Sequence, residues 1–151
     1  MKIIGFQFTK ISGERMSDNI KVNPSTSIEF SNVEEESFDL LKDNKAVSIL
    51  FKYSVKYDKK EDKEEKGEDK EDKKENPLGE IRLEGKIVLS VSEEDSKNIL
   101  KSWKKKQLPP NLNLFLFNTI LRKCTPKAIY LEDEINLPIH TPMPKLKTKE
   151  E

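Results

Sequence analysis

The chain has very little of the material from which catalytic and metal sites are built. Its 151 residues include one cysteine, Cys124, and one histidine, His140. A single cysteine cannot form a disulfide within one chain, and one cysteine with one histidine cannot supply the ligands of a structural zinc site. The sequence contains no glycine-rich phosphate loop, no G-x-S-x-G and no H-E-x-x-H. We therefore expect no enzymatic activity, catalytic residue, metal or cofactor, with Cys124 in the core and His140 at the surface.

Charge of one sign and long apolar runs are also missing. Lysine plus arginine equals aspartate plus glutamate at 28 each, so the chain has no net field to attract nucleic acid or anionic lipid. No stretch approaches the roughly 20 consecutive apolar residues of a transmembrane helix, and the N-terminus lacks the apolar run of a signal peptide. These features predict a cytoplasmic protein that binds no nucleic acid and does not insert into membranes.

Alternation of apolar and polar residues predicts four strands. It runs through residues 3–11, irregularly through 27–41, and then clearly through 47–57 and 81–91. The fourth strand should pair antiparallel with the third. Residues 12–27 carry turn-forming glycine, asparagine and proline among several apolar side chains, which predicts a long apolar loop after the first strand.

Much of the charge is concentrated between the third and fourth predicted strands. Every residue from 58 to 75 except Gly67 is charged, with both signs mixed and no apolar side chain to anchor the segment. Such a composition is typical of disorder. We interpret residues 58–76 as a charged insertion in a single domain covering 1–151. It is either a solvated hairpin tip or a segment for weak cation binding or a regulatory contact.

A short helix and then a long helix are predicted after the strands. Ser92 precedes three acidic residues and is suited to cap a helix, whose positive end favours the acids. The lysines at 104–106 fall at the negative end of the same helix, which explains them better than contact with nucleic acid does. Two prolines at 109–110 then change the direction of the chain before a long helix over 111–135.

The predicted long helix carries more apolar surface than one sheet would cover. Its main stripe recurs at spacings of three and four residues and continues past Pro126, which predicts a kink rather than a break. A second stripe lines another flank of the first turns, at Leu112, Phe115, Leu116 and Ile120. We therefore expect the helix to lie between its own sheet and a partner subunit, with an oligomer interface formed by Leu114, Phe117, Leu121, Cys124, Ala128 and Leu131.

The C-terminal part alternates prolines with apolar residues over 137–146. Prolines neither continue a helix nor donate a hydrogen bond to a sheet, so this part should lie extended on the surface. The complete prediction is an α+β fold. It consists of a four-stranded antiparallel sheet of Greek-key type with a long crossover loop, then a short helix, a long kinked helix and an extended proline-rich end.

Short motifs follow one another in a fixed order along these elements. They are ISGER at 11–15, GEI at 79–81 with EG at 84–85, LPPN at 108–111, ILRKC at 120–124, LP at 137–138 and PMP at 142–144. In the order of these motifs and of the predicted elements, the chain resembles the SecB family of export chaperones, and the resemblance covers nearly the whole chain outside the charged insertion.

The resemblance implies an ATP-independent holding chaperone that binds non-native polypeptides, is linked to protein export and assembles as a dimer of dimers. In such proteins the clients lie in apolar grooves, which here would be formed by 16–22 and 137–146. Burial of client side chains contributes about 25 cal/mol per Å² of apolar area, and an extended tail or strand edge adds main-chain hydrogen bonds. The implied client contacts are Met16, Ile20, Val22, Trp103, Leu108, Leu137, Ile139, Met143 and Leu146.

Two other classes of protein stay open at this point. A dedicated interaction module of the same fold would serve one partner, such as an antitoxin, and would ignore generic unfolded chains. A small-ligand binder or enzyme in an α+β cup would need a compact pocket with convergent polar groups, and the sequence gives no sign of one.

Overall fold

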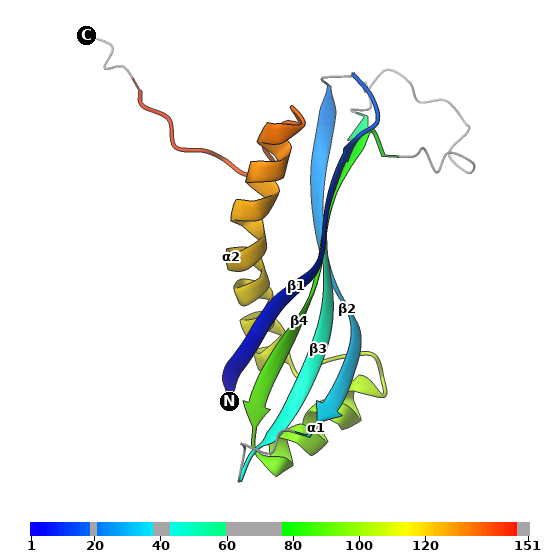
Figure 1. Ribbon diagram of the computed structural model, residues 1–151, viewed down its shortest axis with the longest axis vertical. Coiled ribbons are helices and arrows are strands. Elements are labelled where there is room, and N and C mark those ends of the chain that lie inside the picture. Colours follow the sequence, from blue (N-terminus) through cyan, green and yellow to red (C-terminus); the bar gives the residue numbers. More distant parts are fainter. Residues whose placement is uncertain (19–20, 38–42, 60–76, 148–151) are drawn as a thin grey trace.

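The computed structural model describes residues 1–18, 21–37, 43–59 and 77–147. These residues form a four-stranded sheet followed by two helices, so the predicted α+β class is confirmed. The charged insertion predicted at 58–76 lies outside the described residues, apart from its first two positions. The elements are β1 (Lys2–Arg15), β2 (Val22–Glu36), β3 (Lys45–Lys59), β4 (Gly79–Val91), α1 (Glu93–Trp103) and α2 (Pro110–Glu134) (Figure 1).

The sheet has the strand order β1-β4-β3-β2, and every neighbouring pair is antiparallel. β3 pairs with β4, as predicted. Because β1 lies beside β4, the chain passes from one edge of the sheet to the other between Arg15 and Val22. This is the predicted Greek-key arrangement, in which three consecutive strands form a meander and the remaining strand joins it by a crossover.

The crossover is shorter than the loop predicted over 12–27. β1 continues to Arg15, and β2 already begins at Val22. Pro24 pairs with Tyr57 inside β2, although proline normally counts against a strand. β2 is an edge strand, so the missing N–H of Pro24 removes no bond to a second neighbour. The turn-forming composition of this segment concealed the two strand ends.

The two faces of the sheet differ in polarity. Along β4, alternate residues are buried beneath the helices or only half-buried on the opposite face. On that open face Glu84 lies in register with Lys10 on one side and with Lys52 on the other, and Lys52 lies in register with Glu29. The charges alternate in sign across all four strands, so neighbouring side chains attract.

α2 packs on the apolar face through residues that recur every four positions. Such a row winds slowly round the helix, whereas the predicted stripe alternated spacings of three and four. The sheet is strongly twisted (Figure 1), so the direction of the surface beneath α2 changes along the helix. A row of buried residues that winds round the helix can follow this change. The helix continues unbroken through Pro126, which lies on its exposed side. We call the row the core row; its members are at most 3% exposed and are Leu112, Leu116, Ile120, Cys124, Ala128 and Glu132.

α1 packs at the end of the sheet where β4 finishes, and it contacts β2 and β3 (Figure 1). The Ser92 hydroxyl accepts a hydrogen bond from the backbone N–H of Asp95 at 3.1 Å, so the predicted cap is confirmed. Ile99 joins the core from the inner side of the helix. Neither helix of the described residues combines the length and the apolar character needed to cross a membrane.

Candidate interaction surface

Large apolar side chains remain exposed on three parts of the molecule. They lie on β1 and the start of the crossover, on the outer side of α2, and on the segment after α2, residues 137–147, which we call the tail. Where such side chains lie together, they usually mark a site of interaction. The exposed fractions run from 39% for Ile139 to complete exposure for Leu146, and the residues are Ile4, Ile11, Met16, Leu114, Phe115, Leu121, Tyr130, Ile139, Met143 and Leu146.

The client contacts implied by the SecB resemblance fall into exposed and buried groups. Met16, Ile139, Met143 and Leu146 are exposed, and Trp103 and Leu108 are half-buried. Ile20 lies outside the described residues. Two assignments need correction, because Val22 and Leu137 are only 7% and 8% exposed and belong to the core of this chain. They support the surface from below and have almost no area left for a client.

The first residues of the crossover and the first residues of the tail lie at the same end of the sheet. The Met16 N–H donates to the Leu78 carbonyl at 2.9 Å, and the Leu78 N–H donates to the Tyr57 carbonyl at 2.7 Å. Leu137 packs closely on Gly79, since a Cβ added to Gly79 would lie 2.9 Å from Cδ2 of Leu137. The structure therefore brings Met16 and the beginning of the tail to the same region.

Trp103 and Leu108 lie at the other end of the molecule. They follow α1, which starts where β4 finishes, whereas Met16 lies beside the start of β4. β4 has 13 residues, and at about 3.3 Å per residue its two ends are roughly 40 Å apart. One short peptide segment cannot reach both ends, so these two side chains are separated from the rest of the implied site.

The predicted oligomer interface is also divided by the structure. Leu114 and Leu121 are exposed, while Phe117 stacks on Phe30 with ring centroids 5.4 Å apart and Leu131 packs beside Gly13. Cys124 and Ala128 are fully buried in the core row and have no surface with which to contact a second chain. Their assignment to an interface is therefore wrong, because the buried row of α2 follows a spacing of four.

A buried polar network, which the sequence analysis missed, connects α2, β3 and the tail. Glu132 ends the core row and is fully buried. Its carboxylate accepts hydrogen bonds from the Tyr57 hydroxyl, from the His140 backbone N–H at 2.7 Å and from His140 Nδ1 at 2.5 Å. His140 Nε2 lies 2.9 Å from the Tyr53 hydroxyl. The prediction of a surface histidine is therefore wrong, since the imidazole is 7% exposed.

The sequence holds a weak signal for this network. Glu132 falls on the same row of four-residue spacings as Ile120 and Ala128, where a charged side chain requires a partner. Tyr53 and Tyr57 are four residues apart in a strand, so both point to the face that α2 covers. Nothing in the spacing of the chain, however, links His140 to either of them.

The tyrosines of the network and the neighbouring cysteine have raised pKa values. Burial raises the pKa of Tyr53 to about 12, and burial followed by the bond to Glu132 raises the pKa of Tyr57 well above its ordinary value. Both hydroxyls therefore keep their protons at neutral pH. Burial also raises the pKa of the Cys124 thiol to about 12, which leaves it a poor nucleophile. The described residues contain no cluster of three or more His, Cys, Asp or Glu arranged to hold a metal.

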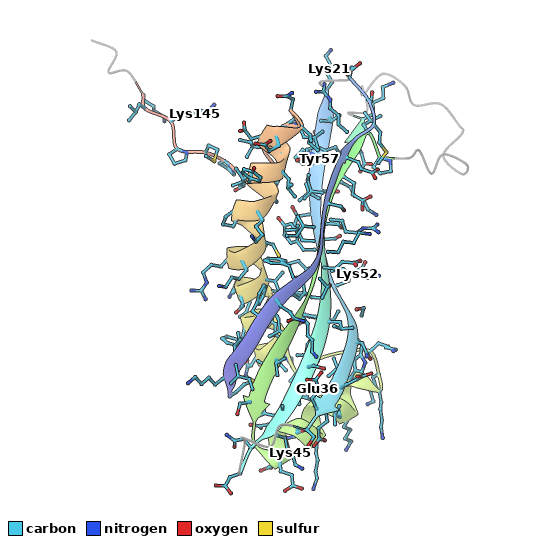
Figure 2. All side chains as sticks on the ribbon, in the orientation of Figure 1. Lys21, Glu36, Lys45, Lys52, Tyr57 and Lys145 are labelled. Carbon is cyan, nitrogen blue, oxygen red and sulfur yellow. The ribbon has the colours of Figure 1, made fainter. Side chains whose placement is uncertain are left out.

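The tail begins with a helix-terminating turn that directs the chain back toward β3. Asn136 has a left-handed φ of 56°, the Leu137 N–H donates to the Glu132 carbonyl at 2.9 Å, and the Asn136 N–H donates to the Asp133 carbonyl. These are the bonds of a Schellman motif. The Tyr57 hydroxyl then lies 2.8 Å from the Pro138 carbonyl. Figure 2 places Tyr57 between α2 and the sheet, and Lys145 far out on the tail.

A hollow of about 290 Å³ lies between β1, β4 and the end of β2, with Gly5, Gln7 and Val88 in its lining. Its charged groups, Lys86 and Glu36, form an ion pair with each other. The hydrogen bond from Lys86 lowers the pKa of the Glu36 carboxyl. These two charges are therefore already paired with each other, in contrast to the convergent polar groups of a typical small-molecule site.

No protein-family model, curated protein or solved structure matches this chain. A functional assignment therefore depends on the exposed apolar surface, on the network at the tail and on the motifs of the sequence.

Proposed function

We propose that this protein is an ATP-independent holding chaperone of the SecB type, which binds unfolded or non-native polypeptides in the cytoplasm and is linked to protein export. The observation that carries the proposal is the apolar surface left exposed on β1, α2 and the tail. Exposure of this kind contributes nothing to the folding of the chain itself, whereas a protein that binds unfolded chains requires it. The ordered motifs, which resemble those of SecB proteins, add support from the sequence.

The energetics of such a surface favour clients of many sequences. Full burial of one large apolar side chain contributes roughly 1.5–3 kcal/mol, and partial burial of an exposed residue such as Leu114 or Met143 contributes less. Association and ordering of an unfolded client cost at least several kcal/mol, so several contacts have to act together. Affinity that is divided among many weak contacts does not depend on any one client residue.

Two lysines of α2 make part of the exposed surface positively charged, which favours acidic over basic clients. Lys123 Nζ lies 5.8 Å from the centroid of the Phe6 ring, and Lys127 Nζ lies 5.1 Å from that of Phe8. Each contact contributes on the order of 0.5–1 kcal/mol at an exposed site. Clients with acidic residues beside apolar ones find complementary charge along this side of α2, which favours them over strongly basic clients.

Assembly as a dimer of dimers is part of the proposal. Leu114 and Leu121 leave apolar area on α2, and β1 is an edge strand with unpaired backbone groups along its 14 residues. The expected mass by light scattering at micromolar concentration is four times the 17.5 kDa of one chain. A monomer under these conditions would contradict the assembly.

Suppression of aggregation tests the chaperone proposal directly. Several chemically unfolded proteins are diluted into buffer with and without a stoichiometric amount of the chain, and light scattering follows their aggregation. We expect slower aggregation for all of them, without ATP. If the aggregation rate of every client stays unchanged while one protein is captured from a lysate, the chain is a dedicated interaction module instead.

A matched pair of tail variants tests the site. Met143→Ser with Leu146→Ser removes two exposed apolar side chains, whereas Lys145→Ser with Lys147→Ser removes two charged ones from the same exposed segment. We expect the first pair to weaken suppression of aggregation and the second pair to retain most of it, because apolar burial provides the affinity. Equal loss in both pairs would show that the apolar side chains of the tail are not the contacts.

A further inference from the structure

Glu132 is an unexpected residue at its position. The preceding members of the core row are apolar, and an apolar side chain at 132 would continue the contact between α2 and the sheet. A buried carboxylate is expensive unless it is paired and hydrogen-bonded, and replacement of a buried ion pair by apolar residues is often neutral or stabilising. Packing alone therefore does not explain Glu132, and its bonds indicate what does.

Both carboxylate oxygens of Glu132 are directed to the tail. Oε1 pairs with His140 Nδ1, and Oε2 accepts the backbone N–H of the same residue. From β3, the hydroxyls of Tyr53 and Tyr57 contact the imidazole ring and the Pro138 carbonyl. One residue of α2 and two residues of β3 thus surround the segment that leaves the helix, and all of their polar atoms in the network are paired.

Little else attaches this part of the tail to the molecule. Between residues 138 and 147, every side chain is exposed except those of His140 and Thr141. Leu137 is buried against Gly79, but it lies at the very start of the tail. The imidazole of His140 is therefore the last largely buried side chain before the exposed stretch that carries Met143.

We propose that Glu132 and His140 are positioning residues, which fasten the root of the tail to β3 and so set the direction in which its apolar residues leave the molecule. The inference rests on the proposed function in so far as those residues contact clients. The direction of the tail at its start affects where Met143 lies, because the tail is stiff. It contains Pro138, Pro142 and Pro144, and each proline fixes its own φ and restricts the preceding residue. A tail that is fixed at His140 therefore presents Met143 within a narrow range of positions.

The first test is the mobility of the tail in the full-length protein. Amide hydrogen exchange is measured for wild type, His140→Gln, Glu132→Gln and the control Lys145→Gln, which changes an exposed tail residue outside the network. We expect the backbone amide of residue 140 to be protected from exchange about tenfold or more in the wild type and in the control. In the other two variants this protection should be lost. Equal exchange in all four proteins would overturn the proposal.

The wild-type chain alone provides a second test that does not depend on the folding of a variant. His140 is the only histidine, so every imidazole signal in a nitrogen-15 NMR spectrum belongs to it. A ring N–H held by a buried carboxylate exchanges slowly with water, so we expect a visible Nδ1–H resonance. An imidazole with the averaged signals of a freely rotating, solvated ring would overturn the proposal even if both variants failed to fold.

Aggregation assays on the same four proteins separate this inference from the chaperone proposal. We expect His140→Gln and Glu132→Gln to suppress client aggregation less well than wild type and Lys145→Gln. Release of the tail with undiminished suppression would overturn the positioning role. Failure of the wild type to suppress any aggregation would refute the proposed function instead, and hydrogen exchange would still decide whether the tail is fastened.

Discussion

Replacement of Gly85 by alanine is predicted to destabilise the sheet strongly. Gly85 is buried in β4 and lies in register between Phe8 of β1 and Phe51 of β3. A Cβ at this position would lie 2.5 Å from the Gln7 carbonyl oxygen and 2.6 Å from Cζ of Phe51. None of the glycines that the structure describes has a positive φ, so the requirement at Gly85 is for space and not for a special backbone conformation.

Neither neighbour has room to move away from the new methyl group. The Gln7 carbonyl belongs to the paired ladder of β1 and β4, and the Phe51 ring is enclosed by Phe6 and Phe8 at centroid distances of 5.4 and 6.4 Å. Overpacking of a core costs typically 1–3 kcal/mol and occasionally more, and contact with backbone places this case at the upper end. Alanine returns about 0.5–1 kcal/mol because it is less flexible than glycine when unfolded. The net loss of stability is therefore about 2 kcal/mol or more.

Urea unfolding followed by circular dichroism measures this loss, with the chain concentration held constant because any association between chains would add to the stability. For a slope of about 2 kcal/mol per M, the midpoint should fall by roughly 1 M or more. Gly5→Ala is the matched control, since its Cβ would meet only Val88 at 3.4 Å, an ordinary contact. We expect that variant to be as stable as wild type or slightly more stable. A Gly85→Ala midpoint equal to that of Gly5→Ala would refute the packing described here.

Three further predictions follow from the titratable groups. Burial raises the pKa of Cys124 to about 12, so a thiol reagent should label the folded protein only at the rate of unfolding, and rapid labelling without urea would contradict its burial. Tyr53 ionises in the folded state only near a raised pKa of about 12, whereas an unfolded tyrosine ionises near pH 10, so stability should fall as the pH rises above about 10. The pKa of Tyr57 is raised as well, so Tyr57 contributes to this fall, and Tyr57→Phe should reduce it, as measured by urea midpoints at alkaline pH. Because Lys86 lowers the pKa of Glu36, their pair stabilises the fold above the unfolded pKa of the carboxyl, and this contribution is lost as the pH falls through the folded pKa. Since both side chains are partly exposed, Lys86→Met should cost no more than about 1 kcal/mol at pH 7 and less in acid, and an equal cost at both pH values would contradict the pairing.

The strands could be predicted wherever one face of the sheet is buried. The fourth strand was expected over 81–91 and spans Gly79–Val91, because its alternate residues face either the helices or the open side. The helix start at Ser92 was equally clear, since capping depends on residues that are adjacent in sequence. Pro24 misled the prediction, because its place at the edge of the sheet is a property of the topology.

The face of α2 that is buried could not be obtained from the helix alone. Its sequence contains two overlapping apolar patterns, and the buried core row takes residues from both of them. The placement of the helix on the sheet decides that Leu112 and Leu116 are buried while Leu114 is exposed. The partner of Glu132 was hidden for a similar reason, since His140 reaches it only after the chain reverses direction at Asn136.

The two edges of the sheet differ in whether they accept another strand. β2 contains Pro24, and a proline at an edge hinders the addition of a strand, whereas the 14 residues of β1 include no proline. Head-to-tail polymers require both edges, since each copy has to offer one edge and occupy the other. A second copy joined through β1 would contribute its own β1, and the combined sheet would then end in a β2 on both sides. Pro24 therefore hinders the growth of fibres from copies of this chain, even though large apolar side chains remain exposed on it.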